Sequence, residues 1–184
     1  MATVAATDRS RRAVVLAVLA GALASLAIGI YGRTASPTDR ELLLGFNSLI
    51  AAKFWLTAVT GLLVTLQLLT AMWMYGRLGL RAPTHLGAVH RGIGAVALLV
   101  SLPVAYNCLF VIGFGSTDAR VLLHSVVGCL VYGAFVAKVV GLQAPEAPSW
   151  LVTVAGGMLF TLLVLAVLTS AVWYLGAHGM PGLG

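Results

Sequence analysis

Five long apolar stretches, separated by short polar segments, dominate the chain. They cover residues 13–30, 48–75, 90–113, 119–141 and 150–175. A helix needs about 20 apolar residues to cross a bilayer, and each stretch is close to or above that length. The segments between them carry turn formers and charges, such as Pro37 with Asp39 and the pair Pro145 and Pro148. The pattern predicts an all-α membrane protein, a bundle of five transmembrane helices that forms a single domain over residues 1–184.

Two local patterns refine this prediction. Gly21, Ser25 and Gly29 recur every four residues in the first helix, which favours close approach of another helix. Ser116, Thr117 and Asp118 precede the fourth helix, and each of them can cap its start. The third helix contains Pro103, which is expected to bend it just before Tyr106 and Asn107.

Composition supports the membrane interpretation. The chain is 60% hydrophobic and 9% charged, with a mean hydropathy of +1.03, whereas soluble domains are roughly 45–50% apolar and about 25% charged. A separate soluble domain is therefore not expected, and the lipid bilayer is the expected environment. A net charge of +6 suggests nucleic acid in some proteins, but here the basic residues stand at the ends of apolar stretches, so no nucleic-acid partner is expected.

The basic residues are shared unequally between the two sides of the predicted bundle. One side collects seven of the 11 Lys and Arg residues, namely Arg9, Arg11, Arg12, Arg77, Arg81, Arg91 and Lys138. The other side collects Arg33, Arg40, Lys53 and Arg120. Because cytoplasmic segments carry an excess of positive charge, we predict a bacterial plasma-membrane protein with a cytoplasmic N-terminus and an external C-terminus.

Most polar residues within apolar surroundings lie on the third and fourth predicted helices. They are Ser101, Tyr106, Asn107, Cys108, His124, Ser125, Cys129 and Tyr132. A further set shares one face of the second helix, where it indicates either hydrogen bonding between helices or the lining of a cofactor or quinone site. This second set is Thr57, Thr60 and Gln67.

His124 is the candidate that deserves a functional hypothesis, since ionisable groups inside a bilayer are costly and rare. Gly128 and Tyr132 follow it at one and two turns on the same face, and a glycine beside a histidine leaves room for a planar ligand such as haem b. Asn107 has the matching depth on the third helix, but asparagine is a poor iron ligand. Alternatives are a neutral, structural histidine bonded to Asn107, Ser125 or a threonine, and a proton or quinone site.

Other candidate residues surround this one. His178 or Met180, after the fifth helix, would be an unforeseen sixth iron ligand. Arg120, one turn before His124, either anchors its helix or binds haem propionates. His85 and His90 are expected to be interfacial residues beside Arg91, at the mouth of the third helix, where they can contact lipid phosphate or a partner. A second haem there would have no visible second ligand.

The chain after residue 85 resembles an uncharacterised family of small actinobacterial membrane proteins. The residues that carry the resemblance are His90-Arg91-Gly92, Leu102 to Leu109, Arg120 to Ser125, Gly128-Cys129, Tyr132-Gly133, Lys138, Gly156-Gly157 and Leu168 to Trp173. That family is in turn similar in plan to cytochrome b561 and ferric-reductase membrane domains. In the family pattern the position of Asn107 is often histidine, which implies a bis-histidine haem with His124, and this chain departs from the pattern there.

Three classes of function follow. The first is a b-type haem-binding electron carrier between a quinone or other membrane pool and an external redox protein. The second is a non-catalytic subunit or assembly factor of a larger membrane complex. A small transporter comes last, because Asp8, Asp39, Glu41, Asp118 and Glu146 all lie at segment ends or in loops. The sequence contains no hydrolase or transferase motif.

Overall fold

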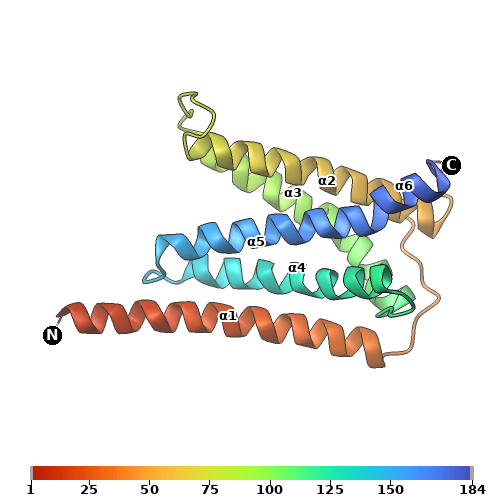
Figure 1. Ribbon diagram of the computed structural model, residues 1–184, viewed down its shortest axis with the longest axis horizontal. Coiled ribbons are helices and arrows are strands. Elements are labelled where there is room, and N and C mark those ends of the chain that lie inside the picture. The colour runs from red at the N-terminus through yellow and green to blue at the C-terminus, as the bar shows by residue number, and fades with distance from the viewer. Residues whose placement is uncertain (1, 183–184) are drawn as a thin grey trace. The chain divides into compact units, whose positions relative to one another are not determined.

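The computed structural model of the protein describes residues 2–182 and contains five long helices (Figure 1). The first three are α1 (Ala2–Thr34), α2 (Leu49–Met74) and α3 (Leu86–Tyr106). They are followed by α4 (Ala119–Gln143) and α5 (Ser149–Val167). Two short π-helices prolong the long ones: Asn107–Ile112 continues α3, and Leu168–Val172 joins α5 to α6 (Trp173–His178).

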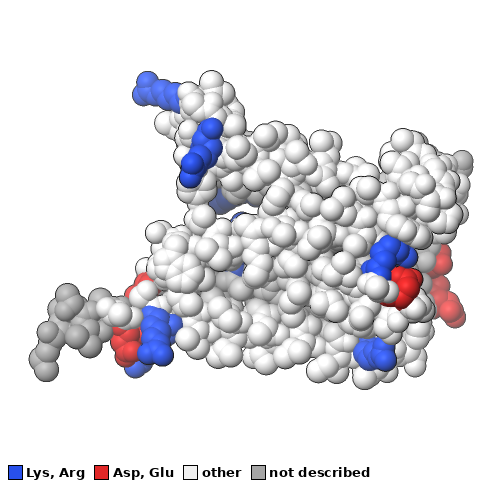
Figure 2. All heavy atoms as spheres, in the orientation of Figure 1, with Lys and Arg blue, Asp and Glu red and all other residues white. Residues whose placement is uncertain are grey.

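Each of the five long helices is long and apolar enough to cross a membrane, with mean hydropathy between 1.8 and 2.6. Their outer faces carry large aliphatic side chains such as Leu23 and Leu62, which are 66% and 62% exposed. Exposed apolar surface on this scale is costly in water and expected in lipid. On the face that Figure 2 shows, Lys and Arg side chains gather near helix ends. No strand occurs in residues 2–182, so the prediction of an all-α membrane protein with five spans is confirmed.

Two helices, α1 and α3, begin before the positions that hydropathy predicts. α1 begins at Ala2 rather than at residue 13, so the polar arm that contains Arg9, Arg11 and Arg12 is helical. α3 begins at Leu86 rather than at His90. Hydropathy marks only the part of a helix that suits lipid, whereas backbone hydrogen bonding continues through charged residues, several of which are good helix formers. The single-domain expectation stays a prediction.

Helix starts follow the capping rules. The Asp118 carboxylate accepts a hydrogen bond of 2.9 Å from the backbone N–H of Val121, which confirms the expected cap of α4. The Ser48 hydroxyl accepts one of 3.2 Å from Ala51 at the start of α2. Both caps satisfy N–H groups that have no partner inside the helix.

The chain forms two compact units, of which the first contains α1, α4 and α5 up to Ala166. α1 and α4 run antiparallel in close contact, because a Cβ added to Gly21 would lie 2.6 Å from the Gly133 carbonyl oxygen, and one added to Gly29 would lie 3.6 Å from the Cys129 sulfur. This confirms that the glycine spacing of the first helix serves close helix packing. α5 contacts α4 through Leu151, which lies against Gly141.

The second unit contains the loop from Ser36, then α2, α3, both π-helices and α6. α2 and α3 run antiparallel: the Gln67 amide lies against Gly94, and the Met74 methyl lies near Gly87. The Phe54 ring of α2 lies 6.0 Å from the Tyr174 ring of α6. The fifth span therefore contributes its last turns to this unit.

Candidate functional site

His124, Gly128 and Tyr132 share a face of α4 in the first unit, and all three are half-buried. At about 100° per residue, His124 lies about 180° around the helix from Gly133, which contacts α1. By the same count, Gly141, where Leu151 of α5 packs, lies about 100° around the helix from His124 and about 180° from Tyr132. The contacts of α4 with α1 at Gly133 and with α5 at Gly141 therefore lie on other sides of the helix than this face.

The backbone at Gly128 is open. A Cβ added there would meet no atom within 4 Å, in contrast to the crowded position of Gly133. An open glycine one turn from a histidine leaves space for a flat group against the helix, as the sequence suggests. His124, Tyr132 and Arg120 each interact with another group in the protein.

The turn before α4 holds the histidine end of this helix in place. The Ser125 hydroxyl, next to His124 in sequence, accepts a 3.1 Å hydrogen bond from the backbone N–H of Gly115. The Arg33 guanidinium at the end of α1 donates a 2.9 Å hydrogen bond to the Ser116 hydroxyl. α1 and α4 are therefore fastened together at this end as well as along their glycines.

Asn107 has a different surrounding in the second unit, where it is the largest fully buried side chain, with an exposed fraction of 0%. Its Nδ2 donates to the backbone oxygen of Leu42, and its Oδ1 accepts from the backbone N–H of the same residue, both at 2.9 Å. The amide thus pairs with one loop residue as a neighbouring strand would. The first position of the π-helix is tied to the loop that precedes α2.

Two further contacts fasten this loop to the same turn. The backbone N–H of Thr38 donates a 2.8 Å hydrogen bond to the Phe110 carbonyl. The Tyr106 hydroxyl donates a 3.2 Å hydrogen bond to the Arg40 carbonyl, and its ring lies 5.1 Å from the Phe110 ring. The segment from Ser36 to Ser48, which we call the α1–α2 strap, is therefore an ordered element.

His90 lies in a polar contact between α2 and α3. Its Nδ1 is 2.8 Å from the Thr70 hydroxyl oxygen, and the Gln67 amide donates to the His90 backbone oxygen. The Thr70 hydroxyl oxygen also lies 2.9 and 3.0 Å from the carbonyl oxygens of Leu66 and Gln67. The Thr70 hydroxyl and the His90 imidazole therefore form a polar link between α2 and α3.

His178 lies at the end of α6 among aromatic rings. It stacks on Tyr174 with ring centroids 4.7 Å apart and meets Trp173 edge-on at 5.6 Å. Its side chain is exposed, and Met180 is 70% exposed. This position belongs to the second unit, as do those of His90 and Asn107, whereas His124 belongs to the first.

Sequence reasoning singled out polar side chains but missed several of their partners. Gln67 does bond to another helix, as predicted, whereas Thr60 donates a 2.8 Å hydrogen bond to Leu56 of its own helix. The pairing of Asn107 with Leu42 has no sequence signal, because a backbone group is the partner. Within residues 2–182 no group of three or more His, Cys, Asp or Glu side chains is arranged to hold a metal ion.

Comparison with known protein families identifies the chain's family. The family described as "Family of unknown function (DUF6529)" matches residues 14–182, nearly the whole chain. No curated protein and no solved structure shows significant similarity to the chain.

Proposed function

The chain belongs to the family of unknown function DUF6529, and within that family we propose that it is a non-catalytic subunit or assembly factor of a larger membrane complex. The observation that carries the proposal is the use of its buried polar groups. In the part of the chain that the structure describes, every buried side-chain nitrogen and oxygen has a hydrogen-bond partner. Active sites commonly leave polar groups poised for a substrate, whereas these groups fasten the chain to itself.

The individual contacts support the same function. Asn107 holds the α1–α2 strap, Gln67 and Thr70 join α2 to the His90 region, and Ser125 secures the turn before α4. The open position at Gly128 of α4 suits a partner helix, because small residues allow transmembrane helices to approach closely.

The test is purification of the full chain in a mild detergent from its native membrane. We expect a colourless protein that co-migrates with larger partners on a native gel, and a His124→Gln variant that assembles to the same extent. The matched control is Gly128→Leu, which fills the open position and should release the partner while the chain still folds. Migration as a monomer under every mild condition would contradict the proposal.

A second candidate, a b-type haem protein, is supported by one observation: the open backbone at Gly128 beside His124. The described residues fit a haem in part, since the first unit offers one imidazole and the space next to it. His124 would hold the iron, Arg120 would lie within reach of a propionate, and the haem would supply one-electron transfer. The similarity in plan to cytochrome b561, a quinone and an external redox partner all belong to this candidate.

Visible spectra distinguish the two candidates. Protein expressed with ample haem is compared with His124→Ala and with the control His85→Ala, whose side chain is exposed at the start of α3. A Soret band present in wild type and in the control but absent in His124→Ala would establish haem binding and replace the first proposal. A featureless wild-type spectrum would exclude the haem.

We also infer the orientation. Five spans put the two ends of the chain on opposite sides of the membrane, and seven of the 11 Lys and Arg residues fall on the N-terminal side. The positive-inside rule then favours a cytoplasmic N-terminus in a bacterial plasma membrane. Labelling of single cysteines introduced at Glu146 and at Glu41 with an impermeant maleimide tests it: only the latter should react in intact cells.

A further inference from the structure

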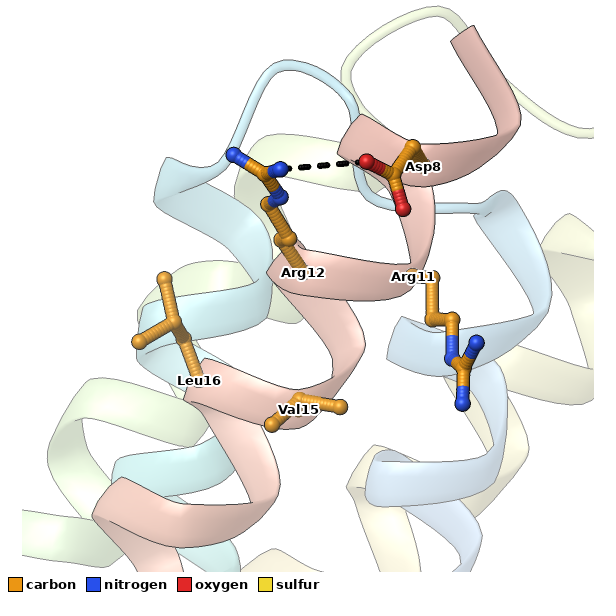
Figure 3. Close-up of a pocket in the computed structure, with 5 residues that line it drawn as sticks. All are labelled: Asp8, Arg11, Arg12, Val15 and Leu16. Atoms are coloured by element: carbon orange, nitrogen blue, oxygen red, sulfur yellow. Dashed lines mark hydrogen bonds and ion pairs between the residues drawn. The ribbon is translucent and has the colours of Figure 1, made fainter. Parts of the chain in front are cut away.

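We propose that the N-terminal end of α1 carries a binding site for the phosphate of an anionic phospholipid, built by Arg11 and Arg12 above Val15 and Leu16. The structure has an open surface hollow of about 350 Å³ there. Figure 3 shows its five lining residues, Asp8, Arg11, Arg12, Val15 and Leu16, which follow one another along one side of the helix. The site is independent of the function proposed above.

The length of α1 places this hollow at headgroup depth. The helix has 33 residues and is about 50 Å long at roughly 1.5 Å per residue, whereas the hydrocarbon core is about 30 Å thick. Its apolar part, Ala13–Ile30, covers about 27 Å and accounts for the hydrocarbon. Arg11 and Arg12 therefore lie at the boundary where lipid phosphates lie, and Val15 and Leu16 lie just inside it.

At the level of the hollow, α1 is covered on one side, where Ala13 and Ala17 are buried, and is exposed on the side of Val15 and Leu16. Gly21 lies level with Gly133 and Ala137 of the antiparallel α4, and α4 ends six residues later, at Gln143. α1 thus continues for about three turns beyond the end of α4. In keeping with this, Val15 is 47% and Leu16 62% exposed, so an acyl chain can lie against them.

The charges suit a phosphate. Arg12 is paired with Asp8 at 3.1 Å, but the two side chains are 75% and 57% exposed, and ion pairs this exposed are weak. Arg11 makes no hydrogen bond or ion pair with the described residues, and in Figure 3 its side chain runs from the helix towards the level of Val15, away from the Arg12 guanidinium. Guanidinium groups bind phosphate oxygens in a two-pronged geometry, so Arg12 can exchange the carboxylate for a lipid phosphate.

A phospholipid is favoured over an acidic peptide because the apolar part of the hollow is continuous with the lipid-facing side of α1. A soluble acidic peptide would bind the arginines alone and would not change the surroundings of Val15 and Leu16. A lipid satisfies both halves at once, with its phosphate on the arginines and its chains on the aliphatic side chains.

The test uses the full chain in a nonionic detergent, titrated with short-chain phosphatidylglycerol and, in parallel, phosphatidylcholine. We expect tighter binding of phosphatidylglycerol, and a loss of about 25-fold in Arg11→Gln/Arg12→Gln, from about 1 kcal/mol per basic residue at 1.4 kcal/mol per tenfold. The charge-matched control is Arg77→Gln/Arg81→Gln, at two exposed positions after α2, which should change the Kd less than about twofold.

Several outcomes would overturn the proposal. These are equal affinity of the wild type for the two lipids, an equal loss in the control variant, or competition by free glycerol phosphate as effective as that of the lipid. Circular dichroism checks the fold of each variant. If the double variant does not fold, the wild-type preference for the anionic lipid and its weakening by salt decide the question, since exposed charges are screened.

Discussion

Replacement of Asn107 by alanine should release the α1–α2 strap. The substitution leaves both the N–H and the C=O of Leu42 without their 2.9 Å partners. Each unpaired backbone group costs about 1–3 kcal/mol when buried, and Leu42 is half-buried, so water recovers part of this cost. The free energy needed to open the strap should therefore fall by about 2–4 kcal/mol. This corresponds to a roughly 30-fold to several-hundred-fold loss of protection of its backbone amides from hydrogen exchange.

Hydrogen–deuterium exchange with mass spectrometry measures this loss segment by segment. Peptides that cover residues 38–44 should exchange faster in Asn107→Ala, while peptides of α4 in the first unit keep their rates. Asn47→Ala is the matched control, because it makes the same change at an exposed position at the end of the same strap. If the strap exchanged equally in wild type and in Asn107→Ala, the two hydrogen bonds would not hold it, and the structural role given to Asn107 would be wrong.

Two further predictions concern helix contacts. Gly133→Ala forces a methyl group into the backbone of α1 and should lower stability by about 1–3 kcal/mol, seen as a lower Tm in detergent. Gly128→Ala meets no atom within 4 Å and should raise the Tm slightly, so equal effects at the two glycines would refute the packing argument. Thr70→Val removes the hydroxyl partner of His90 Nδ1 and should cost about 1 kcal/mol in urea unfolding, whereas Thr65→Val, an exposed position on the same helix, should cost clearly less.

Much of the fold could be predicted from the sequence because its determinants are local. The five spans follow from runs of apolar residues, the α4 cap from Asp118, and the close contact of α1 with α4 from the spacing of Gly21 and Gly29. Hydropathy predicts later starts for α1 and α3 than the structure shows, since it reports the lipid-facing length and not the extent of backbone hydrogen bonding.

The candidate site was less predictable because its contacts are not local. The sequence indicates that a buried asparagine needs partners, but it does not say that Asn107 finds both on Leu42, 65 residues earlier. Counting residues from the turn predicts that Asn107 has the same depth as His124, and the structure shows its amide bonded to Leu42 of the strap. π-helices also have no hydropathy signature, so the widened turn that begins at Asn107 could not be read from the pattern.

The other widened turn, Leu168–Val172, acts as a phase shift in the fifth span. A π-turn takes up about one residue more than an α-turn, so everything after it is rotated by about 100° relative to an uninterrupted helix. Tyr174 reaches Phe54 of α2, and carries His178 stacked upon it, in this rotated frame. The one extra residue of the π-turn therefore decides which side chains of the fifth span face α2 after the turn. Deleting that residue would change those contacts without altering any residue that makes them.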